Sequence, residues 1–339
     1  MKVVTFGEIM LRLAPEGYLK FLQADKFMAT FGGAEANVAV SLANFGVPVD
    51  FVTKLPTHDI GQYAVNTLRF FGVGTDKIVR GGPRVGIYYC EKGASQRPSK
   101  VVYDRAGSSI ALAKKGDFDW NTIFDGADWF HFTGITPALS ADVADLCEEA
   151  LIEAKKRGIT CSCDLNYRKK LWTTEQAGKT MDRLCKYLDV CISNEEDAKD
   201  VFGITADNTD ITSGKLDYEG YKQVAKKLKD RFGFKYVAIT LRESLSATDN
   251  NWAAMLYDGN ESFFSKKYPV HIVDRVGGGD SFGAGLIYSI LQGYTPAKAI
   301  EFAVAASCLK HSIEGDFNMV TVDEVLKLAE GDGSGRVQR

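Results

Sequence analysis

Apolar residues along the chain follow two patterns that alternate with each other. Short, nearly continuous apolar runs predict buried β-strands, and these runs are Val3–Phe6, Val49–Leu55, Trp129–Thr133, Ile159–Asp164, Val190–Ser193 and Tyr236–Thr240. The longer segments between and after them predict helices at Ala34–Phe45, Ile60–Phe71, Ala141–Arg157, Asn194–Phe202, Tyr218–Phe232, Ser281–Leu291, Pro296–His311 and Val322–Ala329. Because strands and helices alternate, we expect an α/β fold with a mainly parallel sheet covered by helices on both faces.

Two stretches depart from this alternation. Residues 9–31 and 85–106 contain short segments in which polar and apolar residues alternate, which predicts a small β-sheet inserted into the main domain. Such a sheet could act as a lid over a site, or it could simply be an extra edge sheet. Residues 1–330 are interpreted as a single domain, and the composition of residues 331–339 predicts a disordered tail. A hairpin is expected near residues 246–264, with turns at Asp249–Asn251 and Asp258–Asn260.

Composition excludes several classes of function. The formal net charge of −3 gives no electrostatic reason to expect nucleic acid or an anionic membrane as a partner. No apolar run is long enough to cross a bilayer. The seven cysteines are an odd number and lie mostly in apolar runs, which indicates reduced core thiols and a cytoplasmic location. The four histidines show no ligand spacing, so no metal site built from protein side chains is expected.

The most informative segment is Gly277-Gly278-Gly279-Asp280, which opens a predicted helix. Glycines let backbone N–H groups approach a ligand closely, and a helix N-terminus favours a bound anion. The carboxylate of Asp280 would repel a phosphate unless it accepts a proton from a hydroxyl that attacks that phosphate. The alternatives are a glycine turn with a capping aspartate and a dinucleotide-binding loop, although such a loop usually opens the first βαβ unit.

Polar side chains also gather where ligands bind in parallel sheets, at the carboxyl ends of strands. Asp164, Asn194 and Thr240 lie at such ends, and the segment Asp164–Arg168 could offer sugar-binding oxygens together with a cation for a carboxylate or phosphate. A solvated loop is the alternative. In Gly32–Asn37, two glycines at a helix start allow a small ligand to touch the backbone, unless they form only a tight turn.

A third candidate contact lies on the predicted small sheet. Tyr103 and Arg105 project from the same face of a strand and, with Arg168, could hold an anionic substrate. Of the neighbouring pair Tyr88 and Tyr89, we expect Tyr89 to share this face if the two strands pair. The alternative is an exposed edge strand that uses charge to prevent aggregation.

These motifs resemble those of the ribokinase-like carbohydrate kinases of the pfkB family, and the resemblance spans nearly the whole chain. The N-terminal signature of that family corresponds to residues 32–39. Its C-terminal signature, usually Asp-Thr-x-Gly-Ala-Gly-Asp, corresponds to residues 274–280. Within the family, Gly134–Ser140 and Asp164–Arg168 are most similar to kinases of 2-keto-3-deoxygluconate.

The resemblance implies a role for each candidate residue. Asp280 would be the base, and the amides of Gly277, Gly278 and Gly279 would stabilise the transferred phosphoryl group. The sugar acid would be held by Gly33, Asn37, Tyr89, Tyr103, Arg105, Ile135 and Arg168. ATP would contact Asn166, Asn194, Thr240 and Arg242, with Mg²⁺ bound largely through phosphates and water. The resemblance also implies a homodimer formed through the β lid.

Three departures from the family pattern accompany this resemblance. Gly278 replaces the usual alanine, Asp197 ends the usual Asn-x-x-Glu motif, and the loop after Thr240 lacks its usual glycines. The leading hypothesis is ATP-dependent phosphorylation of the terminal hydroxyl of 2-keto-3-deoxygluconate. The alternatives are a kinase for fructose or another neutral sugar, and a sugar-binding sensor without catalysis.

Overall fold

The computed structural model describes residues 1–194, 196–206 and 218–333. Its strands are β1 (Val3–Phe6), β2 (Met10–Ala14), β3 (Met28–Gly32), β4 (Val49–Val52), β5 (Lys54–Leu55), β6 (Val79–Arg80), β7 (Gly86–Glu91), β8 (Lys100–Asp104), β9 (Trp129–Thr133), β10 (Thr160–Asp164), β11 (Val190–Asn194), β12 (Tyr236–Ser244), β13 (Asp249–Tyr257), β14 (Ser262–Phe264) and β15 (Tyr268–His271). Its α-helices are α1 (Ala34–Asn44), α2 (Asp59–Phe70), α3 (Trp120–Ile123), α4 (Ala141–Lys156), α5 (Thr174–Leu184), α6 (Asp197–Phe202), α7 (Tyr218–Phe232), α8 (Gly278–Leu291), α9 (Pro296–Lys310) and α10 (Val322–Glu330). The predicted elements are present, except that Val49–Leu55 divides into two strands and α6 begins only at Asp197.

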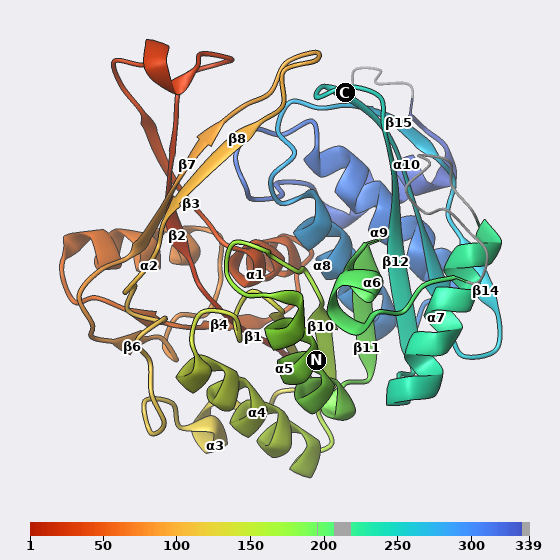
Figure 1. Ribbon diagram of the computed structural model, residues 1–339, viewed down its shortest axis with the longest axis horizontal. Coiled ribbons are helices and arrows are strands. Elements are labelled where there is room, and N and C mark those ends of the chain that lie inside the picture. Colours follow the sequence, from red (N-terminus) through yellow and green to blue (C-terminus); the bar gives the residue numbers. More distant parts are fainter. Residues whose placement is uncertain (195, 207–217, 334–339) are drawn as a thin grey trace.

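The main sheet confirms the expected α/β fold. Its strands follow the order β14-β13-β12-β11-β10-β9-β1-β4, and β15 also pairs with β13. Within this sheet, neighbouring strands are parallel along the path β12-β11-β10-β9-β1-β4. The strand β13 runs antiparallel to β12, β14 and β15. The strand order reverses at β1, which lies between β4 and β9 (Figure 1). A ligand site is therefore expected at the carboxyl ends of the strands near this switch.

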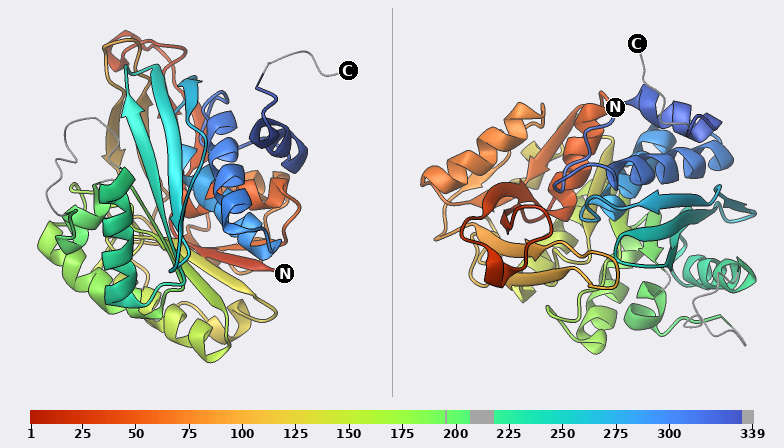
Figure 2. Two further views of the ribbon diagram at one scale, coloured as in Figure 1. Left: turned by 90° about the vertical axis from the view of Figure 1, so that its right-hand side faces the viewer. Right: turned by 90° about the horizontal axis from the view of Figure 1, so that it is seen from above.

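Helices cover both faces of this sheet because neighbouring strand residues point to opposite sides. Val3 and Trp129 belong to the core shared with α1, α8 and α9, whereas Val4 and Phe130 belong to the core shared with α4, α5 and α7. Figure 2 shows the two helical layers on either side of the sheet. Burying one large apolar side chain contributes roughly 1.5–3 kcal/mol, so the two layers together hold the carboxyl ends of the strands in a fixed arrangement.

A separate four-stranded sheet contains the two stretches that depart from the alternation. Its order is β3-β2-β7-β8, with β2 and β7 parallel and the outer pairs antiparallel. It projects from the main body beside α1 and α2 (Figure 1). The short 3₁₀-helix η1 (Phe21–Gln23) lies in the connection from β2 to β3. The predicted small sheet is therefore present.

One predicted turn is confirmed and another is wrong. Asp258 accepts hydrogen bonds from the amides of Asn260 and Glu261 and so makes the turn between β13 and β14. Residues 249–251 lie inside β13 instead, and the first turn falls at residues 245–248. The Ser246 hydroxyl accepts from the amides of Thr248 and Asp249, so a serine turn closes the hairpin before the aspartate is reached.

Two expectations from composition can be compared with the structure. The seven cysteines are all buried and free, as expected for reduced core thiols. Over the residues that the structure describes, no helix is long and apolar enough to cross a membrane. Residues 334–339 of the predicted tail lie outside those residues.

A buried ion-pair cluster fastens the small sheet to the main body. Arg12 of β2 donates from Nη2 to Asp274 at 2.6 Å and from Nη1 to Asp316 at 2.7 Å. The Tyr88 hydroxyl of β7 donates to the carboxylate of Asp316 at 2.6 Å. Burial raises the pKa of Asp316, and the Arg12 guanidinium opposes that rise. The two strands are thus held to the segments on either side of α8 and α9.

We predict that Arg12→Leu lowers the free energy of unfolding by about 3–5 kcal/mol, because it leaves two buried carboxylates without their cation. Urea denaturation followed by circular dichroism measures this loss. The matched control is Arg84→Leu, which breaks an exposed pair with Asp104 and should cost less than about 1 kcal/mol. Equal small losses in the two variants would show that the Arg12 cluster does not hold the small sheet.

Candidate active site

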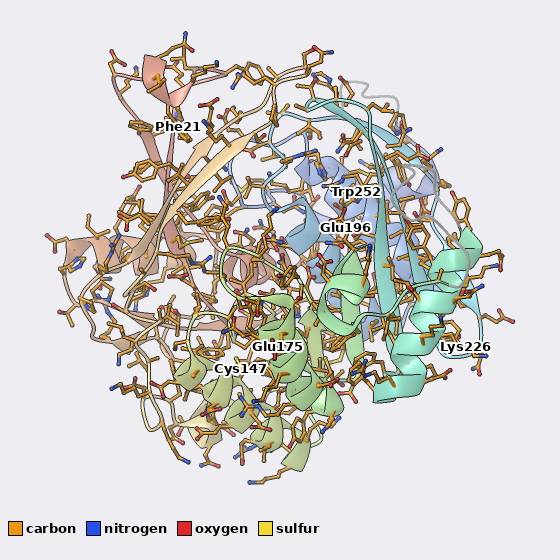
Figure 3. The ribbon with its side chains drawn as sticks, viewed as in Figure 1. Phe21, Cys147, Glu175, Glu196, Lys226 and Trp252 are labelled. Atoms are coloured by element: carbon orange, nitrogen blue, oxygen red, sulfur yellow. The ribbon has the colours of Figure 1, made fainter. Side chains whose placement is uncertain are left out.

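A cavity of about 510 Å³ opens at the carboxyl ends of the parallel strands, between the small sheet and the N-terminus of α8. Glu196 and Trp252, labelled in Figure 3, are among its lining residues. Most of the predicted site residues line this one cavity: Gly33, Asn37, Tyr103, Arg105, Ile135, Asn166, Arg168, Asn194, Thr240, Arg242, Gly277, Gly279 and Asp280. Gly278 and Tyr89 do not line it.

The turn that precedes α8 requires glycine for two physical reasons. Gly277 has φ 84°, in the left-handed region that other residues avoid. A Cβ on Gly277 would also lie 2.0 Å from the carbonyl oxygen of Asp316. Gly279 differs, because a Cβ there would meet no other atom within 4 Å and the residue is exposed to the cavity. The first turn of α8 therefore presents its backbone to open space, where a helix N-terminus favours an anion.

Gly278 differs from the expectation that all three glycine amides face a phosphoryl group. Its N–H donates to the carbonyl of Arg275 at 3.3 Å, and the residue lies outside the cavity lining. A Cβ here would lie 2.5 Å from Cε1 of His311, whose Nδ1 is hydrogen-bonded to the carbonyl of Ser307. The buried imidazole thus occupies the space that the usual alanine of the signature would need.

Asp280 lies in the first turn of α8, with its carboxylate at the cavity. The side-chain amide of Asn37 donates to it at 2.7 Å. Burial raises the pKa of Asp280 to about 7; the Asn37 hydrogen bond and Arg168 oppose this rise, and the carboxylates of Glu35 and Asp316 add to it. A carboxylate whose pKa lies near neutrality is well suited to accept and release a proton at that pH.

A second group of carboxylates, Asp164 and Asp197, forms an acidic wall of the same cavity. Burial and the neighbouring carboxylates of Asp197 and Asp280 raise the pKa of Asp164, and burial raises the pKa of Asp197 to about 6. Asn194 accepts from the Asp197 amide at 2.9 Å, and Asp197 accepts from the Asn194 amide at 3.4 Å. Among the residues that the structure describes, no group of three or more His, Cys, Asp or Glu side chains could hold a metal ion.

Arg105, the cation predicted on the small sheet, already forms an ion pair with Glu8. Arg105 donates from Nε to Glu8 at 2.8 Å and makes a further contact with the same oxygen from Nη2. The guanidinium also lies 5.5 Å from the centre of the Tyr103 ring. Glu8 lines the cavity and was missed in the sequence, because it follows β1 and no local pattern links it to a strand almost a hundred residues away.

The expectation that Tyr89 shares a face with Tyr103 is wrong. The register of β7 and β8 pairs Tyr88 with Tyr103, and directly opposite residues point to the same side of a sheet. Tyr88 therefore lines the cavity, while the ring of Tyr89 packs edge-on against Phe21 and Phe27. Nothing in the surrounding sequence distinguishes Tyr88 from Tyr89, and only the register of β7 against β8 shows which of them faces the cavity.

Glu35 positions the glycine segment at the start of α1. It is buried and accepts hydrogen bonds from the amide and hydroxyl of Thr133 and from the hydroxyl of Thr136, at 2.6–2.8 Å. Gly33 packs so closely that a Cβ would lie 2.0 Å from the carbonyl oxygen of Glu8. Because Glu35 joins α1 to the end of β9, it holds Asn37 and Ile135 on the same cavity.

The predicted nucleotide contacts lie near the ends of β10 and β11 and, for Thr240 and Arg242, within β12. Asn166 adopts a left-handed backbone with φ 39°, and its amide donates to Asp164 at 3.1 Å. Beyond Thr240, β12 continues as a regular strand to Ser244, where it still pairs with Asn250 of β13. The segment that lacks the usual glycines is therefore a strand and not a loop.

Comparison with known proteins identifies the family. The sequence profile of the pfkB family carbohydrate kinases matches residues 1–320. The chain belongs to this family. As a pfkB carbohydrate kinase, it is 53% identical to the 2-dehydro-3-deoxygluconokinase of Thermotoga maritima, with a TM-score of 0.94 over 98% of each chain.

Two further relatives of this kinase agree with the family assignment. A 2-dehydro-3-deoxygalactonokinase of Haloferax volcanii is 30% identical over 98% of both proteins. A pfkB family carbohydrate kinase of Listeria grayi is 35% identical, with a TM-score of 0.90 over 97% of this chain and 100% of that one. The ribokinase-like fold expected from the sequence is thereby confirmed.

Proposed function

We propose that the protein transfers the γ-phosphoryl group of ATP to the terminal (C6) hydroxyl of 2-keto-3-deoxygluconate. The observation that carries this proposal is that one cavity contains both Asp280 at a helix N-terminus and four arginines, of which Arg105 and Arg168 are assigned to the sugar acid. A proton acceptor beside an anion site suits phosphoryl transfer, and a cation elsewhere in the cavity suits a substrate carboxylate. The names of the similar kinases from Thermotoga maritima and Haloferax volcanii support a 2-keto-3-deoxy sugar acid as the substrate.

The chemistry assigned to the chain is positioning, proton transfer and charge stabilisation. Asp280 takes the proton from the sugar hydroxyl while the oxygen of that hydroxyl forms a bond to the γ-phosphorus. The bond between that phosphorus and the β–γ bridging oxygen breaks, and ADP leaves. The amides of Gly277 and Gly279, together with the N-terminus of α8, stabilise the charge on the transferred group.

The acidic wall fits a metal that arrives with the nucleotide. Carboxylate and amide oxygens, such as those of Asp164, Asp197 and Asn194, are the ligand type that Mg²⁺ prefers, and this ion usually keeps several waters. When bound, it supplies positive charge that shields the phosphates from the protein carboxylates. Asp164 and Asp197 would act mainly through those waters, since Asp197 already accepts hydrogen bonds from the amides of Tyr167 and Asn194.

The sugar acid is assigned to the side of the cavity below the small sheet. In the described part of the chain, Arg168 forms no ion pair, and its Nη1 donates only to the neighbouring carbonyl of Tyr167. Because Glu8 neutralises Arg105, Arg168 provides the net positive charge and Arg105 a fixed pair of donors. Gly33, Asn37 and Tyr103 would contact the hydroxyl groups. A neutral sugar would leave the charge of Arg168 without a partner.

We also propose that residues 1–330 act as one kinase domain in which the small sheet is a lid and a dimer contact. Large apolar side chains on and beside its outer strands are exposed, and Leu22 is 98% exposed. The others are Tyr18, Leu19, Phe27, Met28, Val102 and Tyr103. An exposed apolar patch of this kind is typical of an interface, and a second copy would bury it by two-fold symmetry.

Asp280 predicts a characteristic pH dependence. Its pKa of about 7 means that the base is protonated and inactive below that pH, so kcat/KM for the sugar acid should fall about tenfold per pH unit on the acid side. Asn37→Ala removes a hydrogen bond that lowers this pKa, so the fall of kcat/KM on the acid side should begin at a higher pH.

Asp280→Asn should lower kcat by about 10²–10⁴-fold while the sugar acid still binds. A kcat/KM that stays flat down to pH 5 would exclude Asp280 as the base.

Arginine variants test the class of substrate. Arg168→Met should weaken binding of 2-keto-3-deoxygluconate by roughly 10- to 100-fold, because a charge-assisted contact is lost. Binding of fructose, measured in the same calorimetric titration, should not change. The galactonate epimer of the acid is titrated as a third ligand, since one relative is a kinase for that acid. Equal losses for the acid and for fructose would contradict a carboxylate at Arg168.

The dimer is tested by sedimentation. The wild-type protein should sediment as a dimer, and Leu22→Glu should convert it to a monomer, because a charge would be buried in the apolar interface. Phe70→Glu is the matched control, since Phe70 is 82% exposed on α2, outside the small sheet. If the wild-type protein is a monomer at micromolar concentration, the small sheet serves as a lid alone.

A further inference from the structure

Two arginines converge on the cavity from different parts of the chain. Arg242 comes from β12, and Arg275 comes from the segment between β15 and α8. Within the residues that the structure describes, neither forms an ion pair with a carboxylate, although acidic side chains line the same cavity. Arg275 donates from Nη2 only to the neutral side-chain oxygen of Asn250, at 2.8 Å. Two cations that remain unpaired beside available acids indicate a place for an anion that the protein itself does not supply.

The backbone explains why arginine side chains occur here. Members of the pfkB family usually have a glycine-rich loop after this strand, and such loops bind phosphates through successive amides that converge on one point. In this chain, the pairing of Leu241 with Ala253 and of Ser244 with Asn250 extends β12 through the same positions. A regular strand directs its successive amides to opposite sides, so it cannot form that concave surface.

The backbone on either side of Arg275 is fixed by its chain neighbours. Its chain predecessor Asp274 belongs to the buried ion-pair cluster with Arg12, and the amide of Val273 donates to the carbonyl of His311 at 2.8 Å. Gly277, two residues further, begins the anion-binding turn. The guanidinium of Arg275 is half-buried, and its pKa is lowered by that burial and by the charge of Arg242. The two guanidinium groups are therefore close enough to repel each other.

We propose that Arg242 and Arg275 form a clamp for the oligophosphate tail of the phosphoryl donor, in place of the glycine-rich loop. The proposal rests on the proposed kinase function and extends it to a residue, Arg275, that replaces the usual threonine of the family signature. A bound oligophosphate relieves the repulsion between the two cations, which line the same cavity. The planar guanidinium groups fit phosphate oxygens in pairs, which a single lysine would not.

Charge-removing variants test the clamp on the full chain. Arg242→Gln and Arg275→Gln should each raise the Kd for ATP and for inorganic tripolyphosphate by roughly 10- to 100-fold in calorimetric titrations. The Kd for adenosine and the Kd for the sugar acid should change less than about threefold, because neither ligand carries the oligophosphate. The matched control is Arg183→Gln, which removes an exposed arginine of α5 that pairs with Asp145 and Glu148. It should leave all four constants unchanged.

A stability measurement separates a ligand clamp from a purely structural role. Because the two cations repel each other in the free protein, Arg242→Gln should raise the Tm without ligand, whereas a structural residue would lower it. Tripolyphosphate should raise the Tm of the wild-type protein and have little effect on the double variant. Arg242 is exposed on its strand, so this variant remains informative even if Arg275→Gln folds poorly.

The outcomes distinguish the clamp from the proposed substrate. Unchanged constants for ATP and tripolyphosphate in both arginine variants would overturn the clamp, even if the protein phosphorylates the sugar acid. If the protein phosphorylates none of the sugar acids but the variants lose tripolyphosphate as expected, the clamp is supported and the substrate assignment fails.

Discussion

The site depends on one buried interaction, the ion pairs of Arg12 with Asp274 and Asp316. Burying two carboxylates is unfavourable unless cations and hydrogen bonds compensate them. Here Arg12 is joined by Lys310, which is fully buried and donates from Nζ to the carbonyls of Asp274, Ile313 and Gly315. The carbonyl of Asp316 in turn packs against Gly277. The same cluster therefore holds a strand of the small sheet and shapes the turn that begins α8, so the two sides of the cavity cannot be placed independently.

Carboxylates and cations share the cavity, which makes it suitable for two anionic ligands. Burial raises the pKa of Asp164, Asp197 and Asp280, and Arg168 opposes that rise. The N-terminus of α8, Arg242 and Arg275 provide further positive charge. The carboxylates raise one another's pKa because burial weakens their hydration and no cation lies in direct contact with Asp164 or Asp280 in the described part of the chain. A substrate hydroxyl can thus reach a base with a pKa near neutrality, while the negative groups of both ligands meet positive charge.

Local pattern predicted most of the fold and of the site, and long-range partners account for what it missed. Apolar runs placed the parallel strands, and polar residues at their carboxyl ends placed Asp164, Asn194 and Thr240 on one cavity. Strand register could not be predicted, so Tyr89 was chosen where the pairing with Tyr103 brings Tyr88 to the cavity. The partner of Arg105 could not be predicted either, because Glu8 lies in the short connection between β1 and β2 and nothing in the neighbouring sequence marks it. The turn at residues 245–248 was missed because the hydroxyl of Ser246 accepts the hydrogen bonds that close it, whereas the turn was expected at Asp249–Asn251.

The contact between Gly278 and His311 constrains how this sequence can evolve. A methyl group at position 278 would collide with an imidazole that is packed beside Trp252 and hydrogen-bonded to the main chain of Ser307. The two positions are 33 residues apart in sequence, yet alanine at 278 requires the His311 ring to move or to be replaced by a smaller side chain. The residues at these two positions are therefore coupled, and a substitution at one changes what the other can accept.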